Sequence, residues 1–177
     1  DSYHKDLAYR RWASERGGVY APLDEKTPSN PHLAGRPDRD ITTTGGKALT
    51  LVNPAYMTRM VHELGEKEYG LKGHITSLNP IRPENAPDAW ERKALESFEH
   101  GVRNYSEVVR QDGKPILRFM GAFLVEPSCL GCHAQQGYQV GEVRGGISVT
   151  VPVGAGVAAI GLSHNDISQL FIVGFWA

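Results

Sequence analysis

Two cysteines and a histidine occur within five consecutive residues, Cys129-Leu130-Gly131-Cys132-His133. Each cysteine sulfur can add to a vinyl group of haem, and two intervening residues set the sulfurs at the separation of the two vinyls. The adjacent histidine then lies under the iron as its proximal ligand. Because this spacing is the recognised signature of c-type attachment, the sequence predicts one covalent haem c held by Cys129, Cys132 and His133.

Two other chemistries use similar residues. A structural zinc ion needs four nitrogen or sulfur ligands, so a fourth ligand would have to come from a distant histidine. A redox dithiol is expected in a thioredoxin-like βαβ context, which the sequence lacks. The chain has only these 2 cysteines, so thioethers would leave no thiol for a disulfide or a nucleophile. Haem attachment is the favoured interpretation.

The sequence leaves the second axial ligand of the iron open, because haem proteins use histidine, methionine, water or no ligand there. Met57 and Met60 lie one turn apart on the apolar face of a predicted helix, and we expect one of them, Met57 first, to reach the iron. Core packing is the alternative for both methionines. His74, which begins a predicted strand, is the strongest histidine rival. The other methionine and histidines are Met120, His4, His32, His62, His100 and His164, and these histidines lie in polar, solvated runs.

The haem propionates need positively charged donors. Guanidinium groups bind carboxylates bidentately, which makes Arg59 and Arg82 candidates, together with Arg144 beside a glycine pair. Tyr138, five residues after His133, is a candidate for stacking near the porphyrin edge. Surface solvation of the arginines and core packing of the tyrosine are the alternatives.

The bulk composition describes an ordinary soluble domain. The 177 residues are 40% hydrophobic and 22% charged, with a formal net charge of −1. Such a balance excludes an electrostatic nucleic-acid binder. No phosphate-binding loop or dinucleotide fingerprint is present, and no paired acid and base indicates catalysis. We therefore expect a protein that is not by itself an enzyme.

Hydrophobic periodicity and turn residues predict an α+β fold, in which helices lie against an antiparallel sheet. Asn53-Pro54 opens a helix as N-cap and first residue, and Asp112-Gly113 indicates a hairpin. A long loop is expected over 22–41. The predicted helices are 3–16, 54–70 and 87–100, and the predicted strands are 19–21, 48–52, 74–78, 108–110, 116–125 and 145–151.

The chain divides into a haem-binding domain over 1–152, with a leading helix at 1–16, and a C-terminal segment over 153–177. The apolar run 170–177 is either the start of a transmembrane helix or a terminal helix docked on the core. No signal peptide is visible at the N-terminus. Because c-type maturation in bacteria takes place outside the cytoplasmic membrane, we expect a periplasmic, membrane-anchored domain.

Several runs together resemble the DUF3365 or Tll0287-like family of haem-binding extracytoplasmic sensor domains. They are Trp12 with Gly17-Gly18-Val19-Tyr20, Leu51 to Arg59, His74 to Pro87, Cys129 to His133 with Gln136-Gly137-Tyr138, and Arg144 to Val149. The resemblance covers residues 9–152. It implies a PAS-like antiparallel sheet with flanking helices, one c-type haem, and His133 as proximal ligand. Family members often lie between two transmembrane helices of signalling proteins.

Two functions fit these features. In the first, the haem senses redox state or a small gas through a change of its axial ligand, and flanking helices carry the signal toward the membrane. In the second, the domain is an electron carrier or a haem subunit of a membrane electron-transfer complex. A homodimer is expected by analogy with PAS-like domains.

Overall fold

The computed structural model describes residues 2–153. The segment expected to lead toward a membrane, 153–177, therefore lies outside the described residues, apart from Val153. Among the helices of the described part, none is both long and apolar enough to cross a bilayer.

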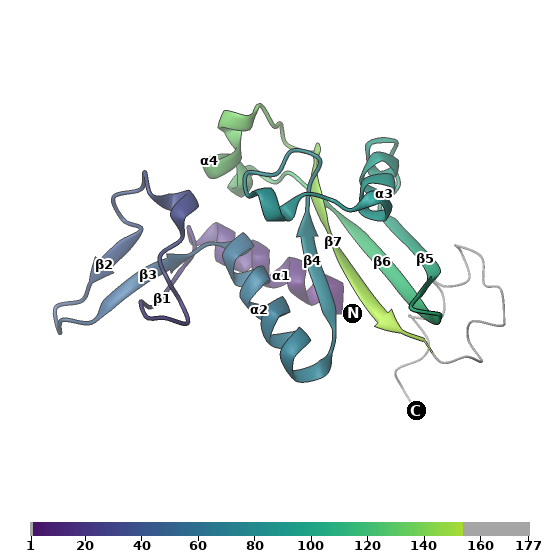
Figure 1. Ribbon diagram of the computed structural model, residues 1–177. Helices are drawn as coiled ribbons and strands as arrows, with labels where there is room; N and C mark the ends of the chain where they lie inside the picture. The colour runs from purple at the N-terminus through teal and green to yellow at the C-terminus, as the bar shows by residue number, and fades with distance from the viewer. Residues whose placement is uncertain (1, 154–177) are drawn as a thin grey trace.

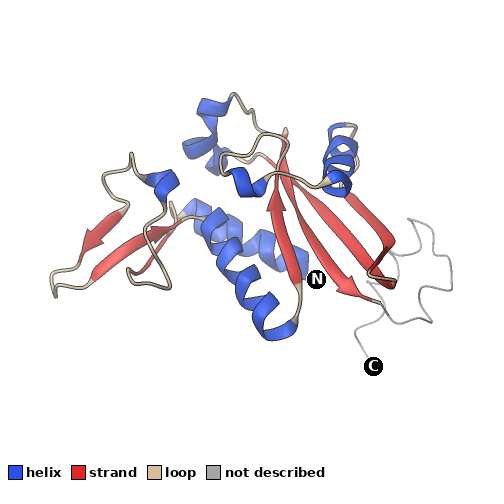
Figure 2. Ribbon diagram, viewed as in Figure 1, coloured by secondary structure: helices blue, strands red, loops and turns tan. Residues whose placement is uncertain are grey.

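A four-stranded antiparallel sheet forms the centre of the fold, in the order β4-β7-β6-β5 (Figures 1 and 2). Its strands are β4 (Lys72–Thr76), β5 (Asn104–Gln111), β6 (Lys114–Leu124) and β7 (Val143–Pro152). The hairpin between β5 and β6 turns at Asp112 and Gly113, which have φ values of 52° and 75°. Positive φ at both positions is what a tight two-residue hairpin requires, so the Asp-Gly prediction is confirmed.

Helix α3 (Ala89–Glu99) packs its apolar side on this sheet. Leu95 and Phe98 are buried against Met120 of β6, with Trp90 and Tyr105 at the edge of the cluster. The helix begins with a capping box formed by Asp88 and Glu91. Together with the sheet, this packing confirms the α+β, PAS-like arrangement of helices on an antiparallel sheet.

Two longer helices lie beside β4. Helix α1 (Ser2–Glu15) packs against α2 (Pro54–Tyr69), and α2 packs against β4. Asn53 caps α2 by accepting a hydrogen bond from the Tyr56 N–H, and Gly70 ends the helix in the left-handed conformation. Both of these α2 boundaries were predicted from the sequence.

The predicted apolar side of α2 does not face the core. Val61 and Leu64 are 56% and 53% exposed, whereas Tyr56 and Thr58 are buried. Helical spacing tells which residues share a side but not where that side points. Here the polar side faces inward, because Thr58 accepts a hydrogen bond from Arg10 of α1.

A second, three-stranded antiparallel sheet stands apart from the first, with α1 and α2 between the two sheets (Figure 1). Its strands are β1 (Val19–Pro22), β3 (Ala48–Val52) and β2 (Asp40–Thr42), in that order. Strand β2 lies at the end of the long predicted loop and was not predicted. A three-residue strand carries too little alternation to be recognised without its partner.

Strand β7 lies very close to both of its neighbours, β4 and β6, where the sheet meets its connecting loops. A Cβ added at Gly145 would lie 2.2 Å from the Thr76 carbonyl oxygen, and one at Gly146 would lie 2.8 Å from the Gly121 carbonyl oxygen. On the other side, β6 pairs Phe123 with Gly145 but Leu124 with Val143. Arg144 is therefore the extra residue of a β-bulge, and such bulges redirect side chains beside functional sites.

Gly145→Ala should destabilise the fold, because the new Cβ has to push the backbone of β4 away from β7. We expect a loss of about 1–3 kcal/mol in the free energy of unfolding, measured by urea denaturation. Gly65→Ala is the matched control, since its Cβ meets nothing within 4 Å in α2 and should stabilise the protein slightly. Equal stability of both variants would contradict the close approach.

Candidate functional site

The cysteine-histidine motif folds as a short continuous helical segment at the end of β6. It comprises η3 (Pro127–Cys129), α4 (Leu130–His133) and η4 (Ala134–Gln136). Residues three and four apart lie on one side of such a segment, so Cys129, Cys132 and His133 share a side. Both cysteines are free thiols; Cys132 is exposed and Cys129 is partly covered. This arrangement is suited to a ligand that attaches to both sulfurs at once.

His133 is held in one orientation by Gln136. The Nδ1 of His133 lies 2.7 Å from the Gln136 Oε1, an oxygen that can only accept, so Nδ1 carries the proton and donates it. Burial lowers the pKa of His133, and the charge of Arg144 lowers it further. The neutral ring is therefore left with an unprotonated Nε2, which is the form that binds a metal ion.

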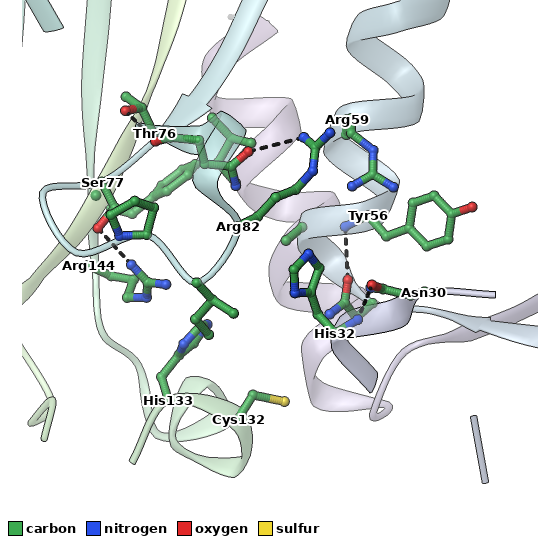
Figure 3. Close-up of a pocket in the computed structure, with 18 of the residues that line it drawn as sticks. Asn30, His32, Tyr56, Arg59, Thr76, Ser77, Arg82, Cys132, His133 and Arg144 are labelled. Carbon is green, nitrogen blue, oxygen red and sulfur yellow. Dashed lines mark hydrogen bonds between the residues drawn. The ribbon is translucent and has the colours of Figure 1, made fainter. Parts of the chain in front are cut away.

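A pocket lies beside His133, between the N-terminal turns of α2, the loop after β4 and the start of β7 (Figure 3). Its cavity volume is about 170 Å³, below the roughly 300–1,000 Å³ of sites for drug-sized ligands, so a tetrapyrrole would have to spread the loops that line it. The lining contains four guanidinium groups and no carboxylate. The four residues are Arg10, Arg59, Arg82 and Arg144.

Among the four arginines, Arg144 has the contacts that hold it most firmly in the wall of this pocket. Its Nη1 donates to the Ser77 hydroxyl at 2.8 Å, and its guanidinium lies 5.0 Å from the centroid of the Tyr138 ring. Its Nε is buried and has no hydrogen-bond partner within the described part of the chain. Burial lowers the pKa of Arg144. A half-buried cation with a buried, unused donor is costly unless an anion joins it, so this wall of the pocket fits a carboxylate ligand.

The other three arginines contact neighbouring side chains while their guanidinium groups stay at the pocket. Arg10 donates to Thr58 and stacks on the Phe123 ring. Arg59 stacks on Tyr56, with a distant pairing of 3.7 Å to Glu63. Arg82 pairs with Glu84 at 3.3 Å. The carboxylates that pair with Arg59 and Arg82 are largely exposed, so these pairs hold the arginines weakly.

The structure brings together five of the residues that the sequence pointed to. Cys132, His133, Arg59, Arg82 and Arg144 line the pocket. Cys129 lies one helical turn from Cys132, and Tyr138 contacts the lining residue Arg144.

Met57 and Met60 do not line the pocket. Helix α2 directs Ala55, Tyr56 and Arg59 toward it, and Met57 lies roughly 200° around the helix from Ala55. Both methionines are partly exposed. The expectation that one of them reaches the iron therefore has no support in the pocket geometry.

His74, the rival ligand, is used elsewhere. Its Nδ1 lies 3.0 Å from both oxygens of the buried Glu91 carboxylate, and its Nε2 lies 3.1 Å from the Glu84 carbonyl oxygen. Since both nitrogens face acceptors, the ring satisfies both only when it is protonated. Hydrogen bonding to Glu91 raises the pKa of His74 against the effect of burial. Burial acts to raise the pKa of Glu91, but bonds from His74, Ser148 and the backbone outweigh it and lower that pKa.

Among the lining residues that sequence reasoning missed, Arg10 brings charge and His32 brings ligand chemistry. Arg10 looked like part of a charged helix surface, and His32 like part of a solvated loop. Their positions depend on contacts between distant segments, such as the hydrogen bond from the Tyr56 hydroxyl to the Pro28 carbonyl. Among the described residues, no group of three or more His, Cys, Asp and Glu side chains is arranged to hold a metal ion.

Comparison with known proteins gives two findings. The model of a family described as Tll0287-like matches residues 9–152. Among solved structures, the chain is similar to a cyanobacterial protein whose structure is described as "Crystal structure of the cyanobacterial heme-protein Tll0287", with a TM-score of 0.45 and 18% identity, over 55% of this chain and 71% of that one. No curated protein matches the sequence.

His74→Asn should lower the free energy of unfolding by about 1–3 kcal/mol, because buried Glu91 loses a charged partner. The pKa of His74 is raised in the folded state, so its contribution is fully present below its unfolded pKa near 6.5 and is lost as the pH rises through the folded value. The lowered pKa of Glu91 means that the contribution is also lost in acid. Urea denaturation across pH should therefore show the largest difference from the unmodified chain between about pH 4.5 and 6.5. A difference that grows above pH 8 would contradict the protonated pair.

Proposed function

This chain belongs to the Tll0287-like family, and from that premise we propose that it is an extracytoplasmic c-type haem domain that senses redox state or a small gas. One observation carries the proposal. His133, neutral and oriented by Gln136, adjoins a pocket that also contains Cys132, four guanidinium groups and no carboxylate.

The motif residues fit covalent attachment of the haem. Each thiol of Cys129 and Cys132 adds across a vinyl double bond, so that sulfur bonds to one carbon and the thiol hydrogen goes to the other. The addition balances without an oxidant. The Nε2 of His133 would supply the proximal bond to iron, and the hydrogen bond from Nδ1 to Gln136 fixes the ring and increases its basicity.

The arginines fit the two propionates of haem. A guanidinium can bind a carboxylate through two parallel hydrogen bonds. The unused, buried Nε of Arg144 is the best placed donor. Arg59 extends from α2 on the opposite side of the pocket, and Arg82 extends from the loop after β4 (Figure 3). The N-terminal turn of α2 adds a weak positive potential at the same place.

The contacts of α1 favour a sensor over a simple carrier. Haem supplies an iron whose oxidation state and axial ligands can change. Arg10 of α1 lines the pocket, and the neighbouring Arg11 forms a two-point salt bridge with Glu126, just before η3. A shift of the motif or of the pocket wall therefore acts directly on the leading helix. Such coupling is needed to pass a signal along the chain and is not needed for electron transfer.

The alternative function is an electron carrier or a haem subunit of a membrane electron-transfer complex. The exposure of Cys132 favours it, because an attached haem edge near the surface shortens the path to a redox partner. Both functions place the domain outside the cytoplasmic membrane, anchored through a flanking segment, where c-type attachment takes place. Neither makes the domain an enzyme by itself, and a second copy of the chain is the proposed partner in the sensor.

Expression with a c-type maturation system should give a protein that stays haem-bound after denaturation. The pyridine haemochrome should have the spectrum of a haem with both vinyls saturated, because both sulfurs are attached. Cys129→Ala with Cys132→Ala should lose all denaturation-resistant haem, and Cys129→Ala alone should shift the spectrum toward one free vinyl. Absence of covalent haem in the unmodified protein would contradict the proposed function.

Visible spectra of the oxidised, reduced and reduced CO-treated protein should separate sensor from carrier. A sensor should bind CO readily or change its spin state on reduction, because one axial ligand has to be labile. An iron that is low-spin in both states and does not react with CO would instead favour the electron carrier.

A further inference from the structure

Apart from the motif residues, the lining of the pocket contains one side chain that is free to bind the iron. Thioether bonds to the haem would consume Cys132, and His133 is the proximal ligand. Two other lining residues, His32 and Tyr56, carry groups that ligate haem iron. The Tyr56 hydroxyl donates to the Pro28 carbonyl oxygen at 2.7 Å, which commits it to the loop. This leaves His32.

The His32 ring is free to take a ligand, which the rings of His74 and His62 are not. Among residues 2–153, no hydrogen bond or ion pair involves its ring nitrogens, and the residue is exposed. By contrast, both nitrogens of His74 are hydrogen-bonded. The His62 ring is packed so closely against β4 that a Cβ on Gly73 would lie 2.7 Å from it.

The backbone that carries His32 is fixed, although the side chain is not. His32 is the second residue of η1 (Pro31–Leu33), whose N-cap Asn30 is 5% exposed and accepts the His32 N–H at 3.1 Å. The side chain of Leu33 is 7% exposed and anchors the other end of η1. An imidazole on an ordered turn loses little backbone entropy when it binds a metal.

The loop of His32 also lies next to the haem motif. Figure 3 shows His32 and Cys132 at the same pocket. His32 lies on the side of the pocket where α2 is, and Ser77 and Arg144 form the opposite wall.

We propose that His32 is the second axial ligand, so that the iron in this chain is held between the imidazoles of His133 and His32. The proposal rests on the haem site proposed above and replaces the methionine ligand expected from the sequence. Because His32 belongs to the long loop and His133 to the attachment segment, release of His32 would free the loop while the haem stays covalently bound. His32 is then the ligand whose release a sensor could use.

The test uses the mature haem protein and compares His32→Ala with Met57→Ala and Met60→Ala. The unmodified protein should be low-spin when oxidised, with the electron paramagnetic resonance signal of two imidazole ligands. His32→Ala should become high-spin and bind CO or cyanide faster by roughly tenfold or more, because no internal ligand competes. Added imidazole should restore the low-spin spectrum. The two methionine variants should match the unmodified protein.

The variants distinguish a wrong axial ligand from a wrong haem site. A low-spin His32→Ala protein overturns the proposal, and a spectral change in Met57→Ala would restore the methionine interpretation. If His32→Ala fails to accumulate, His32→Met decides: it should remain six-coordinate, gain a sulfur-to-iron absorption band and have a higher reduction potential. An unchanged His32→Met spectrum overturns the proposal as well. Absence of covalent haem in the unmodified protein would refute the proposed function itself, and the haemochrome distinguishes this from loss of the axial ligand alone.

Discussion

The Thr76 carbonyl oxygen occupies the space that a side chain at position 145 would need, and the pocket depends on this contact. Because Gly145 lets β4 and β7 approach so closely, the end of β4 meets the start of β7 at the bulge that carries Arg144. Arg144 can then donate to Ser77, the first residue after β4. One backbone constraint thus joins the loop after β4 to the wall of the site and directs a half-buried cation into the pocket.

That cation explains why the site is suited to a particular kind of ligand. Four guanidinium groups line one pocket, the lining contains no carboxylate, and a buried donor is left unused. Burying positive charge costs free energy that an anionic ligand can return. Burial lowers the pKa of His133, and the same positive charge lowers it further, which favours the neutral ring that binds a metal ion. The pocket is therefore suited to a ligand that brings negative groups to the arginines and a metal ion to His133, and a haem with two propionates has both.

Local signals predicted much of the fold, and long-range contacts account for what they missed. Asn53-Pro54 and Asp112-Gly113 gave correct boundaries because capping and tight turns depend on residues within a few positions of each other. The motif at 129–133 was equally local. The direction in which the apolar side of α2 points could not be predicted, since it depends on Arg10 of a different helix bonding to Thr58. His32 was overlooked for the same reason: the contacts that hold its loop at the pocket come from residues more than twenty positions away.

The two histidines at the pocket differ in how firmly the fold holds them, and this difference determines what each can do. His133 is fixed by its side chain, through Gln136, within a helical segment that two thioethers would also fix. His32 is fixed only through its backbone, on a loop that is joined to α2 by the hydrogen bond between Tyr56 and Pro28. Tyr56 lies one turn from Arg59, which lines the pocket, so the same helix turn contacts the loop and the pocket. A change in the ligand on the His32 side would therefore reach α2 through Tyr56 and α1 through Arg10, whereas the attachment side would stay in place.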